Sequence, residues 1–288
     1  MLEMFSAGFM QRAWLAGLIV AVICPLIGSF LVLRRQSMIG DGLGHIAFAG
    51  VAGGALLGAQ PVLSAALATV LGALVIEKVR SRLNTFSEMV LAIFFYSGIG
   101  LAVIFSSMNR MGGFNLSSIL FGSLMTISTA DLWVVAVLGL FACAFTVMFY
   151  RPLQYITFDE TSARVAGLPA GKLNVWLAVL TALTVALSMR IVGLLLVSAM
   201  MVIPVACALQ SARSFAGTII GGIVYGIITV TVGLTVSYYA DLAPGGTIVL
   251  TGTALFILSC LKQSFVKEDA VPPAACCHHH EVDKNEKS

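Results

Sequence analysis

The chain has few charged residues for its length. Of its 288 residues only 10% are Asp, Glu, Lys or Arg, whereas 59% are hydrophobic; a soluble domain carries about 25% charged residues. The formal net charge of +3 is too small, and its basic residues too dispersed, to indicate a nucleic-acid-binding surface. The composition therefore excludes an ordinary soluble domain and indicates an all-α, polytopic membrane protein.

Several functional motifs are absent as well. The sequence contains no GxxxxGK[ST] phosphate-binding loop, so any energy from ATP must come from another subunit. It contains neither HExxH nor GxSxG, which argues against an intramembrane hydrolase. The cysteines form no disulfide framework, since those outside the C-terminal region are scattered in apolar segments: Cys24, Cys143, Cys207 and Cys260. Residues 1–12 lack a basic region followed by a cleavage site, so we expect no cleaved signal peptide.

What the sequence has in abundance is long apolar segments. Each of the following is a candidate transmembrane helix: residues 13–33, 37–57, 62–76, 87–105, 132–150, 173–189, 191–209, 215–239 and 247–261. Residues 116–127 are apolar but too short to span, and we expect a re-entrant or interfacial piece there. We therefore predict about nine transmembrane helices, with eight as the alternative, and a break between the sixth and seventh at Arg190.

The polar segments divide the chain into a membrane domain and a tail. Residues 1–261 hold all the apolar segments, and residues 151–172 form the longest polar interval between them. Residues 262–288 are charged and lack an apolar period, so we expect this tail to be disordered.

The distribution of basic residues predicts the orientation. If the loop after the first span is cytoplasmic and the sides alternate from there, that side holds thirteen of the 16 Lys and Arg residues. The outer side then holds only Arg12, Arg110 and Arg190. Cytoplasmic loops carry an excess of Lys and Arg. We therefore expect the N-terminus outside and the C-terminus in the cytoplasm.

The second apolar segment carries an ionisable pair. Asp41 is followed four residues later by His45, the one histidine outside the C-terminal tail. At this spacing the two side chains share one face of a helix. Ionisable groups inside a membrane span are costly and usually functional, and a carboxylate with an imidazole suits a divalent transition metal. The alternative is that Asp41 caps the helix start and His45 satisfies a neighbouring carbonyl group.

Two ligands are fewer than a stable transition-metal site needs. Such sites usually have about four ligands. A two-fold dimer would bring two copies of Asp41 and two of His45 together on its axis. This ligand deficit motivates the hypothesis that the metal site is shared between two copies of the chain, the alternative being a site held wholly within one copy.

The polar interval contains a short helix-like run at residues 158–169. Acidic residues stand near its start, and glycine and proline end it. It either joins two spans or docks against a cytoplasmic partner. The residues that would make such a contact are Asp159, Glu160, Arg164, Ala166, Gly167, Leu168 and Pro169.

The tail contains five consecutive residues that can bind metals: Cys276, Cys277, His278, His279 and His280. Thiolate and imidazole groups favour zinc or copper. The run lacks the spaced pairs of a folded zinc site, so it is either a weak metal-binding tail or an incidental segment.

Several segments together resemble a known family, the membrane permeases of bacterial zinc, manganese and iron ABC importers. Residues 33–45 (LRRQSMIGDGLGH) are similar to that family's second-helix signature, and residues 120–123 (LFGS) to its mid-chain segment. Residues 158–169 resemble its cytoplasmic coupling loop. Two later signatures also match: residues 192–204, which begin VGLLLV and end in IP, and residues 241–247 (DLAPGGT). The resemblance extends over nearly the whole chain to about residue 261.

This resemblance implies a homodimeric, multi-pass permease of the bacterial inner membrane. Its implied partners are two cytoplasmic ATPase subunits and an extracellular or periplasmic metal-binding protein. The metal path falls on Asp41 and His45, and the ATPase contact falls on the loop at residues 158–169. Gly44 departs from the family pattern, in which many members have Ser or Ala, and so removes a hydroxyl near the ligands.

We accordingly predict a permease subunit, not itself an enzyme and without a permanent cofactor, that imports a divalent metal ion, with zinc favoured. Manganese or ferrous iron is the alternative cargo. An ion-coupled secondary carrier is a further alternative, but it predicts two similar halves, and no clear repeat is present.

Overall fold

The structure is a computed structural model that describes residues 8–82, 87–108, 122 and 128–268. All regular elements in these ranges are helices: α2 (Gly8–Leu33), α3 (Ile39–Leu56), α4 (Pro61–Arg82), α5 (Ser87–Met108), α7 (Thr129–Met148), α8 (Tyr150–Phe158), α9 (Glu160–Val165), α10 (Ala170–Val192), α11 (Leu194–Ser211), α12 (Phe215–Ala240) and α13 (Pro244–Glu268). Nine of these are long and apolar enough to cross a membrane. The predicted all-α, polytopic fold is therefore confirmed.

Some helix boundaries differ from those expected. α10 continues through Arg190, and the chain breaks at Gly193, whose φ of 90° suits glycine. A basic residue in the last turn of a helix is favourable, so Arg190 marks the approach to the break and not the break itself. α13 extends past residue 261 to Glu268, because lengthening an existing helix costs little. The predicted short segment at 116–127, apart from Gly122, and the tail beyond residue 268 lie outside the described residues.

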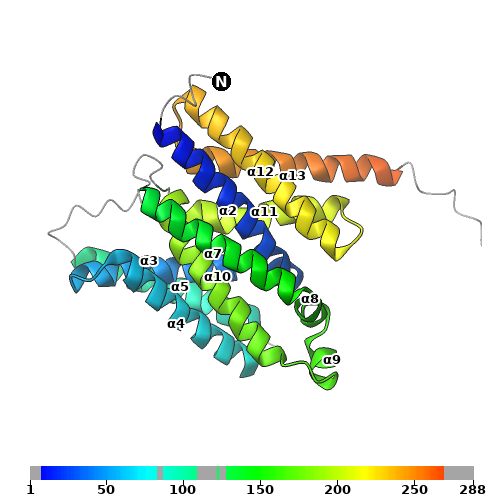
Figure 1. The fold of residues 1–288 in the computed structure, drawn as a ribbon, viewed down its shortest axis with the longest axis horizontal. Helices are drawn as coiled ribbons and strands as arrows, with labels where there is room; N and C mark the ends of the chain where they lie inside the picture. The colour runs from blue at the N-terminus through cyan, green and yellow to red at the C-terminus, as the bar shows by residue number, and fades with distance from the viewer. Residues whose placement is uncertain (1–7, 83–86, 109–121, 123–127, 269–288) are drawn as a thin grey trace, which may run out of the picture.

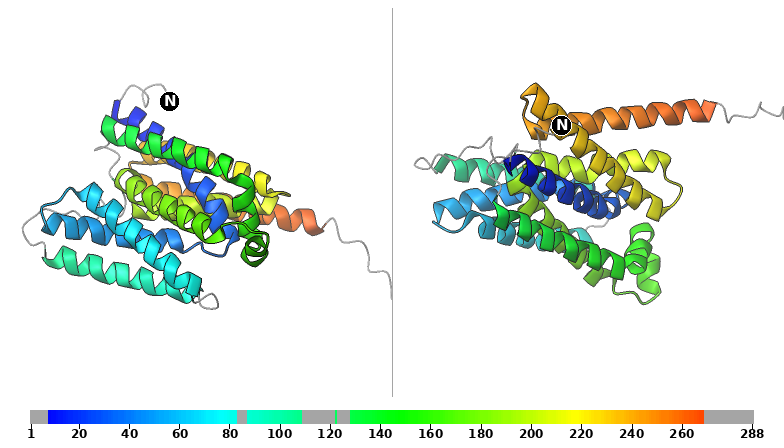
Figure 2. Two further views of the ribbon diagram at one scale, coloured as in Figure 1. Left: turned by 60° about the horizontal axis from the view of Figure 1, so that its bottom comes forward. Right: turned by 45° about the horizontal axis from the view of Figure 1, so that its top comes forward.

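The long helices form a bundle, and the two short ones lie at one end of it (Figures 1 and 2). α2 packs against α7, α11 and α12, while α3 packs against α4, α5, α10 and α11. α8 and α9 follow α7 at the end where α2 finishes and α3 begins, and α8 contacts α2. This end of the bundle is called the α8–α9 end below. The last turns of α13 project beyond the bundle (Figure 1).

Small residues allow α3 to lie close to its neighbours. A Cβ atom added at Gly50 would lie 2.6 Å from Ala68 Cβ, and one at Gly54 would lie 2.0 Å from Ser64 Oγ. These two glycines are four residues apart and face α4, as in other close helix contacts in membranes. The second span is therefore closely packed among its neighbours.

Pro25 lies inside α2 without ending it. The proline cannot donate to the carbonyl group of Ala21, four residues earlier. α12 approaches at this point, since a Cβ added at Gly226 would lie 2.7 Å from the Ala21 oxygen. Prolines are tolerated in membrane helices where neighbouring helices pack around them, and here Gly222 and Gly226 let α12 pack directly against Pro25.

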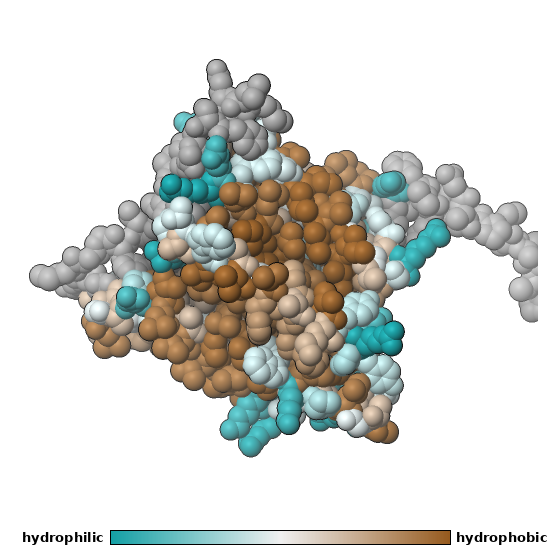
Figure 3. All heavy atoms as spheres, in the orientation of Figure 1, coloured by the Kyte–Doolittle hydropathy of each residue, from teal (hydrophilic) through white to brown (hydrophobic). Residues whose placement is uncertain are grey.

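Apolar side chains cover much of the outer surface. On α4, Leu63, Leu67 and Leu71 repeat every four residues and are exposed, whereas Ala65 and Ala73 are buried. Figure 3 shows hydrophobic side chains over the middle of the visible face and hydrophilic ones toward its margins. Such an extended apolar surface is expected of a protein surrounded by lipid rather than water.

Candidate metal site

A tight turn between α2 and α3 places the ionisable pair. The N–H of Gln36 donates to the carbonyl of Leu31 (2.9 Å), and that of Arg35 donates to the carbonyl of Val32 (3.0 Å). Arg35 has a φ of 57°, so the turn has the bonds and the left-handed residue of a Schellman motif. The motif ends α2 abruptly and allows α3 to begin at Ile39, which puts Asp41 in its first turn.

Asp41 lines an open hollow between α3 and α11. The hollow has a volume of about 280 Å³. Its lining comes from the two residues before α3, from the first turn of α3 and from the N-terminal half of α11: Ser37, Met38, Asp41, Leu195, Ser198, Ala199 and Val202. The carboxylate is thus accompanied by two hydroxyl-bearing side chains, Ser37 and Ser198. Carboxylate and hydroxyl oxygens can coordinate a cation, so the hollow has groups suited to hold one.

Sequence reasoning missed Ser198. Its hydroxyl group donates a long hydrogen bond, 3.4 Å, to the carbonyl of Leu194. A polar residue within the apolar run of residues 194–205 was the available signal, but the run by itself gives no indication that α11 faces Asp41.

His45 lies one turn further along α3, against α5. The His45 and Phe95 rings form a T-shaped pair, with an angle of 90° between their planes and 4.9 Å between their centroids. Gly98 allows this approach, because a Cβ at that position would lie 3.2 Å from His45 Cβ. Phe95 therefore restricts the orientation of the imidazole, as aromatic packing generally does.

The two predicted ligands lie on one helix, as their spacing requires, and within the described residues no third ligand joins them. Across the described ranges no three His, Cys, Asp or Glu side chains gather closely enough to hold a metal ion. The predicted tail ligands Cys276, Cys277, His278, His279 and His280 lie outside those ranges. The described part of one chain thus offers two ligands of the expected kind, Asp41 and His45.

Gly44 stands between these ligands and has a packing role. A Cβ at position 44 would lie 2.0 Å from Leu194 Cδ1, and Leu194 is itself buried. The space that Ser or Ala would occupy is therefore filled by the first residue of α11. Glycine at position 44 thus lets α11 pack closely against α3 beside Asp41 and His45.

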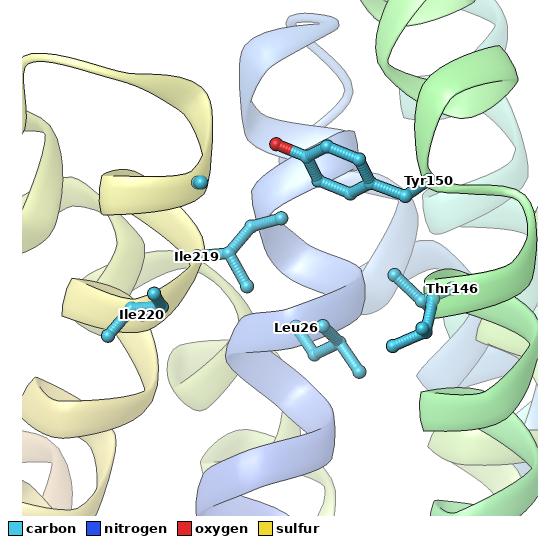
Figure 4. A pocket seen from close by; sticks show the side chains of 7 residues that line it. Leu26, Thr146, Tyr150, Ile219 and Ile220 are labelled. Carbon is cyan, nitrogen blue, oxygen red and sulfur yellow. The ribbon is translucent and has the colours of Figure 1, made fainter.

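A second hollow lies between α2, α7 and α12, and its chemistry is different. Figure 4 shows Leu26, Thr146, Tyr150, Ile219 and Ile220 around it. Its volume is about 350 Å³, and the side chains lining it are mostly apolar, without a charged group among them. A divalent cation would lose its hydration there without gaining charged ligands, so this hollow is not a metal site.

The predicted partner-contact loop folds into α9 and the turn that follows it. The Asp159 carboxylate caps α9 by accepting from the N–H groups of Thr161 (2.9 Å) and Ser162 (3.0 Å). Together with the Ser162 hydroxyl group, these hydrogen bonds lower the pKa of Asp159 below its ordinary value. Glu160 and Arg164 form an ion pair of 2.6 Å along α9.

The turn after α9 depends on a glycine. Gly167 has a φ of 80°, a conformation that costs other residues energy. The N–H of Leu168 then donates to the carbonyl of Ala163 (3.1 Å), and Pro169 precedes α10. Ala166 and Gly167 are exposed in this turn. Beside them, the Val165 side chain is 86% exposed, so the loop presents an unusual apolar group at the α8–α9 end.

The fold and this site define a class, a multi-pass membrane protein of the transport type. Long apolar helices surround an ionisable pair, and a structured polar loop lies at one end of the bundle. The chain belongs to the ABC 3 transport family, which matches residues 6–263. This is a family of permeases that lie in the bacterial membrane.

Individual relatives cover most of the chain. The manganese transport system membrane protein MntC of Halalkalibacterium halodurans is 31% identical and aligns with 89% of this chain and 88% of its own length. The high-affinity zinc uptake system membrane protein ZnuB of Haemophilus influenzae is 30% identical, over 87% of this chain and 96% of its own. Among solved structures, PsaBC from Streptococcus pneumoniae in complex with Fab superposes with a TM-score of 0.80 at 27% identity, covering 92% of this chain and 97% of the PsaBC chain.

Proposed function

We propose that this permease of a metal ABC importer carries zinc ions and holds them at Asp41 and His45. The observation that carries the proposal is the pair itself, placed on one face of α3 with Asp41 at an open hollow. A carboxylate oxygen and an imidazole nitrogen are both good zinc ligands. Ionisable side chains are costly inside a membrane, and those that occur there are usually functional.

The choice of zinc rests on ligand chemistry. Imidazole suits zinc, whereas sites dominated by carboxylate and carbonyl oxygens suit manganese. The relatives carry the names of manganese and zinc systems, and a further relative is named as an iron transport protein. Manganese and ferrous iron are therefore the competing cargoes.

The proposed site is shared by two copies of the chain. Because the described part of one chain supplies two ligands, a two-fold axis beside α3 would supply the four that a transition-metal ion usually takes. His45 binds the ion in its neutral form, and Phe95 keeps the ring oriented. The hydroxyl groups of Ser37 and Ser198 would coordinate the ion as it passes Asp41.

ATP hydrolysis is assigned to two partner subunits at the α8–α9 end. The chain has no phosphate-binding loop, and the exposed loop that includes Asp159 and Pro169 offers a contact surface. The excess of basic residues supports a cytoplasmic location for this end. A separate binding protein would deliver the ion at the opposite end, and movement of the partner subunits would open the path inward.

Metal uptake in cells that express the intact system tests the proposal. Cells with the wild-type chain should take up radioactive zinc in preference to manganese, and only when the partner ATPase is active. Asp41→Asn should abolish uptake. Asp241→Asn is the matched control, because it removes a carboxylate from the left-handed residue after α12, where Asn is tolerated. Preferred uptake of manganese would overturn the assignment of zinc, and normal uptake by Asp41→Asn would overturn the site.

A further inference from the structure

Arg34 joins the turn before α3 to two elements that are remote in the sequence. One guanidinium nitrogen, Nη2, donates to Asn174 Oδ1 on α10 at 2.7 Å and to the carbonyl of Ile156 on α8 at 3.4 Å. The turn that carries Arg34 leads directly into α3 and Asp41. One side chain thus links the helix of the proposed metal ligands to both sides of the loop at residues 158–169.

Both acceptors suit a positive charge. Ile156 belongs to the last turn of α8, where carbonyl groups lack donors within the helix and carry partial negative charge. Asn174 is only 3% exposed, so its amide oxygen would be costly to leave without a donor. Arg34 satisfies both groups at once, which a single lysine ammonium would do with a less rigid geometry.

A cluster of charged residues surrounds Arg34 at the α8–α9 end. Arg80 makes a two-pronged pair with Glu77 on α4, at 2.8 and 3.0 Å, and both residues are buried. Burial and the nearby Arg80 lower the pKa of Arg34 to about 10, against the opposing effect of Glu160 and Glu77. Arg34 therefore stays charged at neutral pH.

Glu160 extends the cluster onto α9. Burial raises its pKa, but Arg164, Arg80 and Arg34 more than offset that effect, so the pKa of Glu160 is lowered. The α2–α3 turn, α4 and α9 are thereby joined electrostatically. The cluster thus links the loop to the α2–α3 turn electrostatically, in addition to the packing of α8 against α2 and of α9 against α10.

We infer that Arg34 is a positioning residue that couples movement of the loop at residues 158–169 to α3 and its proposed metal ligands. The inference rests on the proposed function, in which that loop receives the ATPase subunits. A displaced loop would pull Arg34 through Ile156 and Asn174, and the tight turn would pass the movement to the first turn of α3. Loss of Arg34 would leave the ligands intact but disconnect them from ATP hydrolysis.

The experiment measures transport and ATP hydrolysis in the same preparation. The permease is reconstituted into lipid vesicles with its ATPase subunits and binding protein, and zinc transported per ATP hydrolysed is compared among variants. Arg34→Gln should lower this ratio by about fivefold or more, the usual lower range of coupling between sites. Equilibrium zinc binding without ATP should remain as in the wild type. Arg34→Lys should recover part of the ratio.

The neighbouring Arg35 supplies a matched control. Its side chain is exposed, so Arg35→Gln removes the same charge one residue away and should leave the ratio unchanged. If Arg34→Gln fails to assemble, Asn174→Leu removes the buried acceptor with little change in volume, and the same loss of coupling is expected. A wild-type ratio in whichever of these variants assembles would overturn the inference. Absence of ATP-dependent zinc transport in the wild type would instead overturn the proposed function.

Discussion

Leu194 occupies the space beside Gly44, where a Cβ atom would lie 2.0 Å from Leu194 Cδ1. The contact brings the start of α11, just after the break at Gly193, against the residue next to the proposed metal ligand His45. Because it depends on the absence of one methyl group, it is open to a simple test.

Gly44→Ala should destabilise the protein by about 1 kcal/mol, the lower range for an overpacked interior, because the leucine methyl group can rotate away. Leu194→Ala should relieve the clash, so the double variant should lose less stability than the sum of the two single variants. Thermal unfolding in detergent measures this. Gly100→Ala is the control, since a Cβ at Gly100 meets nothing within 4 Å; strictly additive effects at positions 44 and 194 would contradict the packing account.

The cap of α9 should be needed for binding of the partner ATPase. Asp159→Ala removes the acceptor for the first N–H groups of a six-residue helix, and loss of such a cap destabilises the start of a helix. Asp159→Asn keeps an acceptor oxygen. We expect the ATPase subunit to co-purify with Asp159→Asn but much less with Asp159→Ala. Equal losses in both variants would show that the charge, not the cap, makes the contact.

The same contact should resist mild acid. The pKa of Asp159 is lowered in the fold, so the stability that the carboxylate contributes is fully present above its ordinary pKa, about 3.9. It is lost only as the pH falls through the lower pKa of the folded state. Binding of the ATPase subunit should therefore be nearly equal at pH 7.5 and pH 5.5; a marked weakening would point to another titrating group.

Zinc uptake, by contrast, should fall over that pH range. The imidazole of His45 binds a metal only when neutral, so protons compete with the ion for its ring nitrogen. Uptake at pH 5.5, with the binding protein kept loaded, should be well below uptake at pH 7.5. Equal uptake at the two pH values would argue against His45 as a ligand.

The ion pair at the opposite end should matter little for transport. Arg190 Nη1 lies 3.2 Å from Asp131 Oδ1, and the arginine side chain is 56% exposed. Exposed pairs of this kind contribute about 0.2–1 kcal/mol, so Arg190→Gln should lower stability only slightly and leave uptake intact. Asp131→Ala should cost more, because Asp131 also forms a capping box with Ser128 at the start of α7. Loss of uptake in Arg190→Gln would place part of the ion path here.

The sequence predicted those features that depend on local spacing. Apolar length identified the nine spans, and the four-residue interval placed Asp41 and His45 on one face of α3. The break at Gly193 was misplaced at Arg190 because a charge within an apolar run resembles a boundary, whereas backbone conformation decides where the helix stops. The contact of Arg34 with Asn174 joins residues 140 positions apart. Only the packing of α2 against α8 and α10 brings such residues together.

The central claim is that Asp41 and His45 hold the transported ion jointly with a second copy of the chain. Its most direct test is the number of zinc ions bound per chain in the purified permease, measured by equilibrium dialysis. We predict one ion for every two wild-type chains, and none at this site in His45→Ala or Asp41→Ala variants that insert and assemble normally. One ion per chain, retained in both variants, would contradict the account and place the metal site elsewhere.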